Sequence, residues 1–481
     1  MMPTNAEYLR FLPEIILTLT GILIMFLEAV LPSGETKTNI FAPVSIVGLA
    51  AALYAAATAD AGSAFHDMLI VDPFGTFFRV LVIGIGILAV FSSSEYLKRE
   101  NMPGGEFYAL LLFSVMGQCV MVTANELIMI FIGLEISSIA SYILAGYLRD
   151  DKRNNESALK YFLLGSFATA FLLYGVAWIY GITAATNLEA VRRAIATPGF
   201  DSFALAGVAA ALIFVGLGFK VSAAPFQIWA PDVYQGAPAP VSAFLSVGPK
   251  AAAFAILLRV FLTAFGPISD RWTPLVWGCA LATMCVGNFA AIKQTNIKRL
   301  LAYSSIAHAG YVLVAVTANS DTGAAAAMFY LAAYALTNIG AFAVVTYFAR
   351  KGEKYVAIDD FAGLAQRQPM MAAMMTIFLL SLIGVPLTGG FFGKFYIFKS
   401  ALDSKLIWLT ILGLLNSAVA AYYYLYILVV MYMKEPGESA ENLPPVGFGL
   451  RVTVYASAIG TLFLGIFPSS VLNYASRTIL K

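Results

Sequence analysis

Four ionisable residues stand in the middle of long apolar stretches of this sequence, where a charge is costly. They are Glu135, Lys220, Lys250 and Lys394. On membrane-insertion scales, a charged side chain at the centre of a spanning helix costs roughly 2.5–3.5 kcal/mol. Three lysines and one acid at such positions need partners or a hydrated cavity, and this combination is typical of a path for protons or ions.

The simplest alternative is that Glu135 and one lysine form a buried pair that only links two helices. Glu135 is the only acid at mid-depth in the apolar runs after the first one, so it cannot neutralise all three lysines. Burial disfavours the charged form of a lysine without a full-time counter-ion. Such a side chain can hold or release a proton according to its neighbours. We therefore expect the four residues to form a proton relay.

Two further residues are candidates for the same path. His308 lies in Ser304-Ser-Ile-Ala-His-Ala-Gly310, and an imidazole can take up and release protons near neutral pH. A lone histidine among small residues is also often a simple hydrogen-bond link between helices. Lys160 is about one turn into its apolar run, from where its ammonium group could instead reach the membrane surface.

The remaining charges of the apolar runs are expected to have structural roles. Glu14 and Glu28 lie near the two ends of the first run, where an interface position is the better interpretation. Arg79 and Arg259 are interpreted as packing or interface residues. None of these four residues enters the expected relay.

The sequence offers no pattern for a metal or redox cofactor. His66, Asp67 and Asp72 fall in a loop, and the three cysteines are scattered without ligand spacing. The glycine-rich segments 216–218 and 389–393 lie inside apolar runs, so a phosphate-binding loop is not expected. With 2 histidines in the chain, a pair of haem ligands is not expected either.

The elements that must hold these residues are membrane-spanning helices. The chain has 481 residues, of which 60% are hydrophobic and 12% charged, whereas soluble domains have roughly 45–50% and 25%. This composition excludes a water-soluble enzyme and a disordered chain. The apolar runs are continuous rather than alternating, which favours helices over a membrane barrel. A net charge of +2 gives no reason to expect a nucleic-acid partner.

Fourteen apolar runs are long enough to span a bilayer as helices. They cover residues 11–31, 40–59, 73–93, 107–123, 125–147, 156–181, 202–221, 239–265, 272–291, 296–318, 322–349, 369–402, 406–433 and 449–468. The connections between the runs are short. We therefore predict an all-α integral membrane protein that forms a single polytopic domain over residues 1–481.

Three of these runs contain helix breakers and are predicted to be broken: span 7 at residues 220–225, span 8 at 247–250 and span 12 at 384–394. Backbone groups freed at membrane depth need protein or water as partners, and paired breaks in two halves point to an ion pathway. The breaks in spans 7 and 12 lie five spans apart. This spacing suits two inverted five-helix repeats, residues 107–265 and 272–433, although no residue-level repeat is visible.

The distribution of lysine and arginine predicts the orientation of the chain. Alternate connections carry about twice as many of these residues as the others, so the richer set is placed in the cytoplasm and both termini outside. The richer set is Lys37, Lys98, Arg99, Arg149, Lys152, Arg153, Lys293, Lys298, Arg299, Arg350, Lys351, Lys354, Arg367 and Lys434; the other is Arg10, Arg192, Arg193, Arg271, Lys405, Arg477 and Lys481.

Four motifs carry a resemblance to a known family. The longest, residues 226–254, contains Val-Tyr-Gln-Gly-Ala-Pro and is similar to the antiporter-like membrane subunits of the proton-pumping NADH-quinone oxidoreductase, respiratory complex I. The sequence of this motif resembles that of the N type of subunit more than that of the L or M type. The other motifs are residues 156–165, 303–311 and 386–396, so the resemblance extends over roughly residues 105–430.

The resemblance implies proton translocation driven by quinone reduction in partner subunits of the complex. It implies no cofactor in this chain, while NADH, FMN, iron–sulfur clusters and quinone are expected in the partner subunits. The partners would be neighbouring antiporter-like and small membrane subunits, in a bacterial inner membrane with both termini periplasmic. The implied conduction residues are Glu135, Lys220, Lys250 and Lys394, with further roles for Lys160 and His308.

Other classes of membrane protein share this architecture. The chain could belong to a multi-subunit cation/proton antiporter or to a membrane-bound hydrogenase. A purely structural scaffold subunit is the third alternative, and the lysines in mid-membrane positions argue against it.

Overall fold

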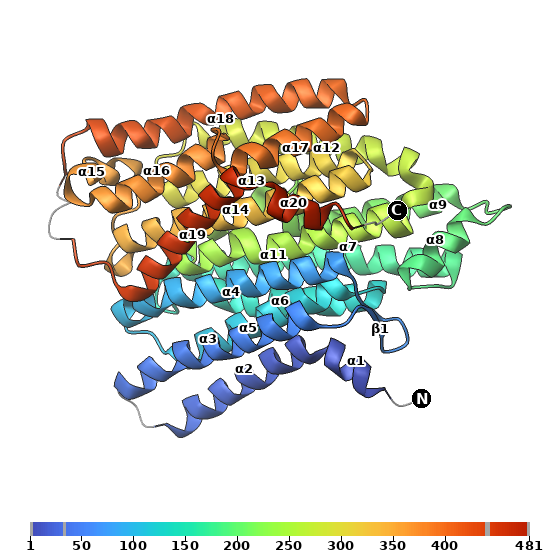
Figure 1. Cartoon of the computed structure of the whole chain (residues 1–481), viewed down its shortest axis with the longest axis horizontal. Helices are drawn as coiled ribbons and strands as arrows, with labels where there is room; N and C mark the ends of the chain where they lie inside the picture. The colour runs from blue at the N-terminus through green and yellow to red at the C-terminus, as the bar shows by residue number, and fades with distance from the viewer. Residues whose placement is uncertain (1–2, 32–34, 438–442, 479–481) are drawn as a thin grey trace.

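The computed structural model describes residues 3–31, 35–437 and 443–478. In these residues, 13 helices are long and apolar enough to cross a membrane, and they lie side by side in one elongated bundle (Figure 1). Thirteen of the predicted runs correspond to these helices. The remaining run, 369–402, is divided between α16 (Pro369–Ile383) and α17 (Gly389–Asp403). The predicted all-α membrane fold is therefore confirmed.

The elements follow one another along the chain with short connections. The long helices are α2 (Leu12–Val30), α3 (Glu35–Thr58), α4 (Pro73–Glu100), α5 (Gly104–Thr123), α6 (Leu127–Ala145), α7 (Lys152–Thr183), α9 (Phe203–Val221), α11 (Ala239–Arg259), α12 (Ser269–Ala291), α13 (Ile297–Thr317), α14 (Asp321–Phe348), α18 (Ile407–Met433) and α19 (Phe448–Ile466). The shorter elements are α1 (Asn5–Arg10), the hairpin β1 (Gly62–Ala64) and β2 (Leu69–Val71), α8 (Leu188–Ala196), α10 (Trp229–Gly236), α15 (Leu364–Arg367) and α20 (Ser469–Ala475).

Two of the predicted helix breaks are present. Helix α9 ends at Val221, and Ser222 takes a left-handed conformation with φ of 61° before the chain turns into α10. Helix α16 ends at Ile383, and the next residue, Gly384, is also left-handed with φ of 94°. Since a left-handed residue stops the helical hydrogen-bond ladder, both helices end inside the bundle and leave backbone carbonyls in need of partners.

The predicted break in span 8 is wrong. Helix α11 continues through Pro249 up to Arg259. Proline removes the donor that would bond the carbonyl four residues earlier, here the carbonyl of Leu245. The Tyr234 hydroxyl donates to that oxygen at 3.3 Å, so the carbonyl is satisfied and the helix is not interrupted. The irregular part of this span is its last turn, a π-helical segment at Val260–Ala264.

The interface position expected for Glu14 is also wrong. Glu14 and Arg79 form a fully buried ion pair with 2.7 Å between the guanidinium and a carboxylate oxygen. The pair joins α2 to α4, so Arg79 lies in the core rather than at an interface. Arg259 forms a second pair, in which two guanidinium nitrogens each donate to a different Asp72 oxygen at 2.8 Å. Asp72 caps the first turn of α4, so this pair ties α11 to α4.

Two isolated β-bridges occupy corresponding places in the two predicted halves. Glu126, directly before α6, pairs with Asn187, which follows α7. Asn296, directly before α13, pairs with Ala357, which follows α14. In each half, the residue before the second helix thus pairs with the segment after the third. This agreement favours an internal repeat, although the division into two halves stays a prediction.

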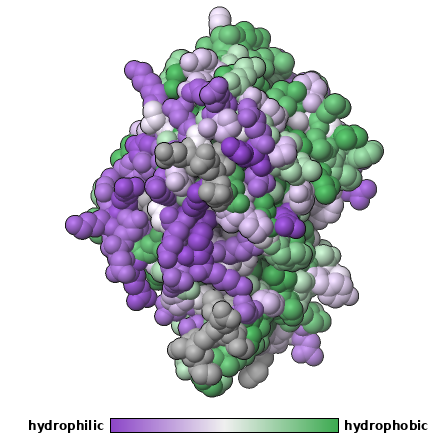
Figure 2. Space-filling view, turned by 90° about the vertical axis from the view of Figure 1, so that its left-hand side faces the viewer, coloured by the Kyte–Doolittle hydropathy of each residue, from purple (hydrophilic) through white to green (hydrophobic). Residues whose placement is uncertain are grey.

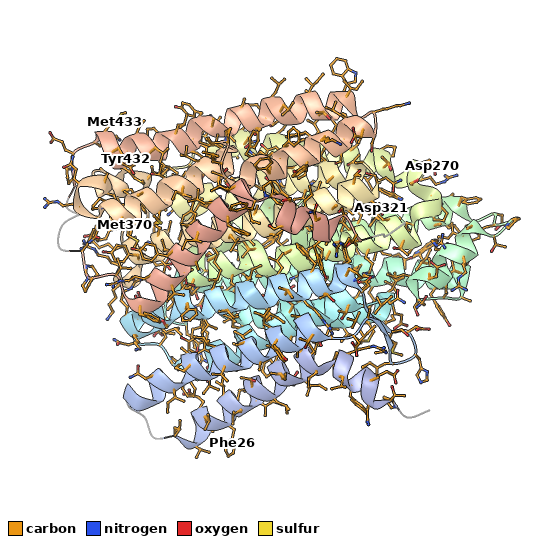
Figure 3. The ribbon with its side chains drawn as sticks, viewed as in Figure 1. Phe26, Asp270, Asp321, Met370, Tyr432 and Met433 are labelled. Atoms are coloured by element: carbon orange, nitrogen blue, oxygen red, sulfur yellow. The ribbon has the colours of Figure 1, made fainter. Side chains whose placement is uncertain are left out.

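The loops predicted to be cytoplasmic lie together at one end of the helices, the left-hand end in Figure 1. Met370, Tyr432 and Met433 mark this end, whereas Asp270 and Asp321 lie toward the opposite one (Figure 3). Figure 2 looks onto the left-hand end, where hydrophilic side chains gather. We call it the basic side; α1, α8 and the hairpin lie at the other end. The Lys37 side chain and Lys481 lie outside the described residues.

Candidate functional site

Lys394 occupies the gap between α16 and α17. Its buried ammonium group donates to the carbonyl oxygens of Leu382 at 2.9 Å and Ile383 at 2.8 Å, and to the Ser417 hydroxyl at 2.8 Å. The last carbonyls of a helix have no partner within it, and the negative end of the helix dipole favours a cation there. The broken span thus builds a cation-binding position. The Tyr311 ring closes it, with its centroid 4.9 Å from the nitrogen.

Lys220 lies in the last turn of α9, where the chain breaks. Its buried nitrogen donates to the Tyr161 hydroxyl at 3.3 Å. The ring centroids of Tyr142 and Tyr161 lie 5.2 and 5.1 Å from the same atom. The surroundings are mainly aromatic, and they offer Lys220 fewer oxygen acceptors than Lys394 has.

Glu135, on α6, interacts electrostatically with Lys220. Within the described part of the chain, however, no ion pair within 4.0 Å joins Glu135 to a lysine, and its buried Oε1 has no hydrogen-bond partner. The closed, purely structural pair considered above is therefore not the arrangement found. The carboxylate acts on Lys220 across a gap.

Lys250 lies near the middle of α11 and is buried. Its ammonium group donates to the backbone carbonyl of Ser305 at 3.1 Å and also to the Ser305 hydroxyl. Ser305 belongs to α13, which places Lys250 at the contact between the two predicted halves.

His308 lies one turn beyond Ser305 on α13, and both of its ring nitrogens have partners. Nδ1 lies 2.5 Å from the Tyr330 hydroxyl, and Nε2 lies 3.2 Å from the Tyr424 hydroxyl. The Tyr424 hydroxyl also bonds that of Ser304. His308 is therefore a link among α13, α14 and α18, and both of its nitrogens contact groups that can donate or accept a proton.

A further set of hydrogen bonds leads toward Lys394. The rings of Tyr424 and Tyr423 are in contact, with centroids 4.4 Å apart. The Tyr423 hydroxyl donates to Asn288 at 3.0 Å, and the Asn288 amide donates to the Tyr311 hydroxyl at 3.2 Å. Tyr311 lies beneath the Lys394 ammonium group. Polar side chains thus extend from Lys250 past His308 to Lys394.

Lys160 does not join this buried line. Its ammonium group pairs with Glu156 at 2.6 Å and Asp232 at 2.7 Å, and about two fifths of its side chain is exposed. Arg299 also pairs with Asp232, at 2.6 Å. Lys160, Glu156 and Asp232 border a cavity of about 160 Å³ at the basic side. The neighbouring Tyr161 contacts Lys220, so Lys160 lies next to the line without a direct bond to it.

Several residues that contact or link the lysines and His308 were not predicted from the sequence. Tyr161 and Ser305 lie in motifs that carried the resemblance, but nothing in their type marked them as contacts of lysines. The tyrosines at residues 422–426 divide by helical face. Tyr423 and Tyr424 are buried, whereas Tyr422 is 64% exposed. Helical periodicity could have separated the inward pair from the outward residue. Among the described residues, no group of three or more His, Cys, Asp or Glu could hold a metal ion.

The arrangement consists of groups that can move protons. Ammonium, imidazole and hydroxyl groups alternate along the line, and each can donate a hydrogen bond while ammonium and imidazole can release a proton. Glu135 influences Lys220 without forming a closed pair with it, so a change of charge on one lysine is poorly neutralised locally and acts on the next.

Comparison with known proteins gives one consistent result. A family model described as the transmembrane region of NADH:quinone oxidoreductase/Mrp antiporter proteins matches residues 124–420. NADH-quinone oxidoreductase subunit N 1 of Solibacter usitatus is 66% identical over 474 residues, which cover 98% of this chain and 97% of that protein. Subunit N of Trichlorobacter lovleyi is 43% identical, over 97% of this chain and 96% of its own length.

Solved structures show the same architecture. A chain of respiratory complex I from Thermus thermophilus is 34% identical, with a TM-score of 0.81 over 96% of this chain and 98% of its own. A chain of the Mrp complex from Dietzia sp. DQ12-45-1b has a TM-score of 0.84 at 19% identity, over 97% of this chain and 96% of its own. The second likeness concerns the fold alone.

Proposed function

Because the chain belongs to the NADH:quinone oxidoreductase/Mrp antiporter transmembrane family, we propose that it is the N type of proton-translocating membrane subunit in an NADH-quinone oxidoreductase. The observation that carries the proposal is the set of three buried lysines, of which Lys250 and Lys394 have hydroxyl, amide and imidazole groups between them, while Lys220 lies against Tyr161 with Glu135 as its acid neighbour. The redox reaction takes place in partner subunits, which hold NADH, FMN, iron–sulfur clusters and quinone.

Proton movement follows from electrostatics. When Lys250 gains or loses a proton, the charge felt by Lys220 changes, and its interaction with Glu135 strengthens or weakens. On the other side, the change reaches Lys394 through Ser305, His308 and the tyrosines of α18. Charges in a poorly hydrated interior influence one another over longer distances than in water. The relay residues are therefore Glu135, Lys220, Lys250, His308 and Lys394.

Lys160 is assigned a different place in this scheme. Its ion pairs, its exposure and its position beside the cavity on the basic side support a role outside the relay. We infer that it sets the local charge beside Lys220, through the neighbouring Tyr161. The two halves, residues 107–265 and 272–433, would each supply one broken span to the relay.

The proposed location is a bacterial inner membrane, with the basic side in the cytoplasm and both termini in the periplasm. The lysine and arginine distribution supports this orientation. The proposed partners are the adjoining antiporter-like and small membrane subunits. A separate cation/proton antiporter is less well supported, because the Mrp complex chain shares only 19% identity, against 66% for the Solibacter subunit N.

The proposal is tested by removing the lysines at the two broken spans. Lys220→Ala or Lys394→Ala should reduce coupled proton pumping by roughly 10²-fold, the usual contribution of an acid–base group, while the complex still assembles. Pumping is measured with the purified complex in vesicles, together with its NADH:quinone activity. Lys405→Ala, which changes an exposed lysine, is the matched control. Wild-type pumping in an assembled Lys394→Ala complex would exclude the relay.

A further inference from the structure

Glu353 is a carboxylate that enters the bundle from a surface loop on the basic side. It ends the short helical turn Lys351–Glu353 after α14. Its Oε2 lies 2.5 Å from the Lys298 ammonium nitrogen, and its Oε1 accepts from the Ala239 amide at 2.6 Å and the Tyr96 hydroxyl at 3.0 Å. The Lys298 side chain is 0% exposed and that of Glu353 14%. Glu353 thus connects solvent to the first residue of α11.

From that point, a stripe of polar side chains follows α11 to Lys250. Ser242, Ser246 and Lys250 are spaced four residues apart and share one face of the helix. All three are buried. The Ala237 carbonyl oxygen accepts from the Lys298 nitrogen at 2.6 Å and from the Ser242 hydroxyl at 3.4 Å. The stripe therefore begins where the Glu353–Lys298 pair ends.

Two buried acceptors beside the stripe indicate that it is hydrated. Asn338 donates to the Ser246 hydroxyl at 2.6 Å, yet its own Oδ1 has no partner among the described residues. Gln118 Oε1 is likewise without one and lies 2.9 Å from the position a Cβ would take on Gly248. Both residues are 0% exposed. Since buried polar atoms are nearly always hydrogen-bonded, water is the natural partner at this level.

We propose that protons enter the relay from the basic side through Glu353 and reach Lys250 along the Ser242–Ser246 face of α11. A proton adds to the Glu353 carboxylate from solvent and then leaves it to water next to Ser242. The serine hydroxyls hold the water molecules that pass it on to the Lys250 amine, and no bond other than O–H and N–H bonds forms or breaks. This inference rests on the proposed function, because it supplies the entrance of that relay.

Water access along α11 is tested without reference to turnover. In the assembled complex, Ser242→Cys and Ser246→Cys are exposed to Ag⁺, and the fraction of thiol protected from later alkylation is followed in time. Ser45→Cys on α3 is the matched control, since Ser45 is also buried and its hydroxyl donates to the Phe41 carbonyl of its own helix. We expect the two α11 thiols to react at least tenfold faster. Equal rates at all three positions would overturn the pathway.

The role of Glu353 is tested separately, because its hydrogen bonds also give it a structural role, in which it links its loop to α11. Glu353→Gln should lower NADH:quinone turnover roughly tenfold, since an amide cannot carry the proton. The double variant Lys298→Gln/Glu353→Gln restores a neutral hydrogen-bonded pair. If Glu353 is the entrance, the turnover of this double variant stays low. Recovery to wild-type turnover would show that Glu353 has only a structural role and would overturn the proposal.

Lys250→Ala separates this inference from the function on which it rests. If turnover survives Lys250→Ala, the relay itself is wrong, and the entrance falls with it. If Lys250→Ala abolishes turnover while Ser246→Cys is no more reactive than Ser45→Cys, the relay stands and only the entrance is wrong.

Discussion

The three lysines differ in what holds their ammonium groups. Lys394 has three oxygen acceptors, two of them at the carbonyl end of α16, whereas Lys250 depends on a single residue, Ser305. Lys220 has one hydroxyl at 3.3 Å and two aromatic rings. An aromatic ring attracts a cation less strongly than a carboxylate does. The charge of Lys220 therefore depends most on its acid neighbour, Glu135.

This dependence gives a prediction for Glu135. Glu135→Gln keeps the size of the side chain but removes the charge that acts on Lys220, so NADH:quinone turnover should fall about tenfold, equivalent to about 1.4 kcal/mol of barrier. Because no ion pair within 4.0 Å is lost, the amount of assembled complex should not change. Glu126→Gln, at the start of the same helix, is the control. Unchanged turnover in Glu135→Gln would leave only a packing role.

The Tyr424 hydroxyl gives a second prediction at this scale. It is the group that bonds both His308 and Ser304. Tyr424→Phe removes this link with little change in volume, and turnover should fall roughly tenfold. Tyr422→Phe changes the same residue type on the exposed face of α18 and should leave turnover unaltered. Equal activities of the two variants, compared in assembled complex, would remove Tyr424 from the relay.

At the scale of elements, the two helix breaks position the lysine side chains of the relay. The end of α16 provides carbonyls for Lys394, and the end of α9 places Lys220 next to Tyr161. Gly390 makes the first arrangement possible, because a Cβ at this position would overlap the Ser381 backbone carbonyl. Helices α16 and α17 can therefore approach closely only where a side chain is missing.

Gly390→Ala tests this close approach. The added methyl should force the two helices apart and destabilise the chain by about 1–3 kcal/mol, as overpacking does, and turnover should fall as the acceptors of Lys394 shift. The measurement is thermal unfolding of the solubilised complex together with its activity. Gly278→Ala on α12, where a Cβ would meet nothing within 4 Å, should be neutral. A wild-type melting temperature for Gly390→Ala would show that the helices can adjust.

The apolar runs and two of the three breaks could be predicted because they depend on residues close together in the sequence. The break at Pro249 was predicted wrongly, since the Tyr234 hydroxyl that satisfies the Leu245 carbonyl comes from another helix. The partner of Glu14 was missed for the same reason, because Arg79 lies on α4 and burial depends on neighbours. Costly charges could be located from the sequence, but the side chains that surround them could not.

At the scale of the whole molecule, the buried charges fall into two classes. Glu14–Arg79 and Asp72–Arg259 are closed ion pairs that join helices across the bundle, whereas the Lys298–Glu353 pair borders the proposed proton entrance. The lysines of the relay have no acid within ion-pair distance in the described part of the chain. A closed pair stabilises one arrangement, whereas an unpaired lysine can change its charge. Stability and proton transfer are thus assigned to different residues.

This division predicts opposite phenotypes for the two classes. Arg79→Ala leaves the Glu14 carboxylate buried and unpaired, which should cost about 3–5 kcal/mol and lower the amount of assembled complex, because α2 loses its tie to α4. The double variant Glu14→Gln/Arg79→Met removes both charges and should recover most of the assembly. Complex that does assemble with either variant should pump at the wild-type rate per molecule. Native gel quantification and pumping assays on the same membranes separate the two effects. Normal assembly of Arg79→Ala with reduced pumping would place the pair in the proton path and reject the division.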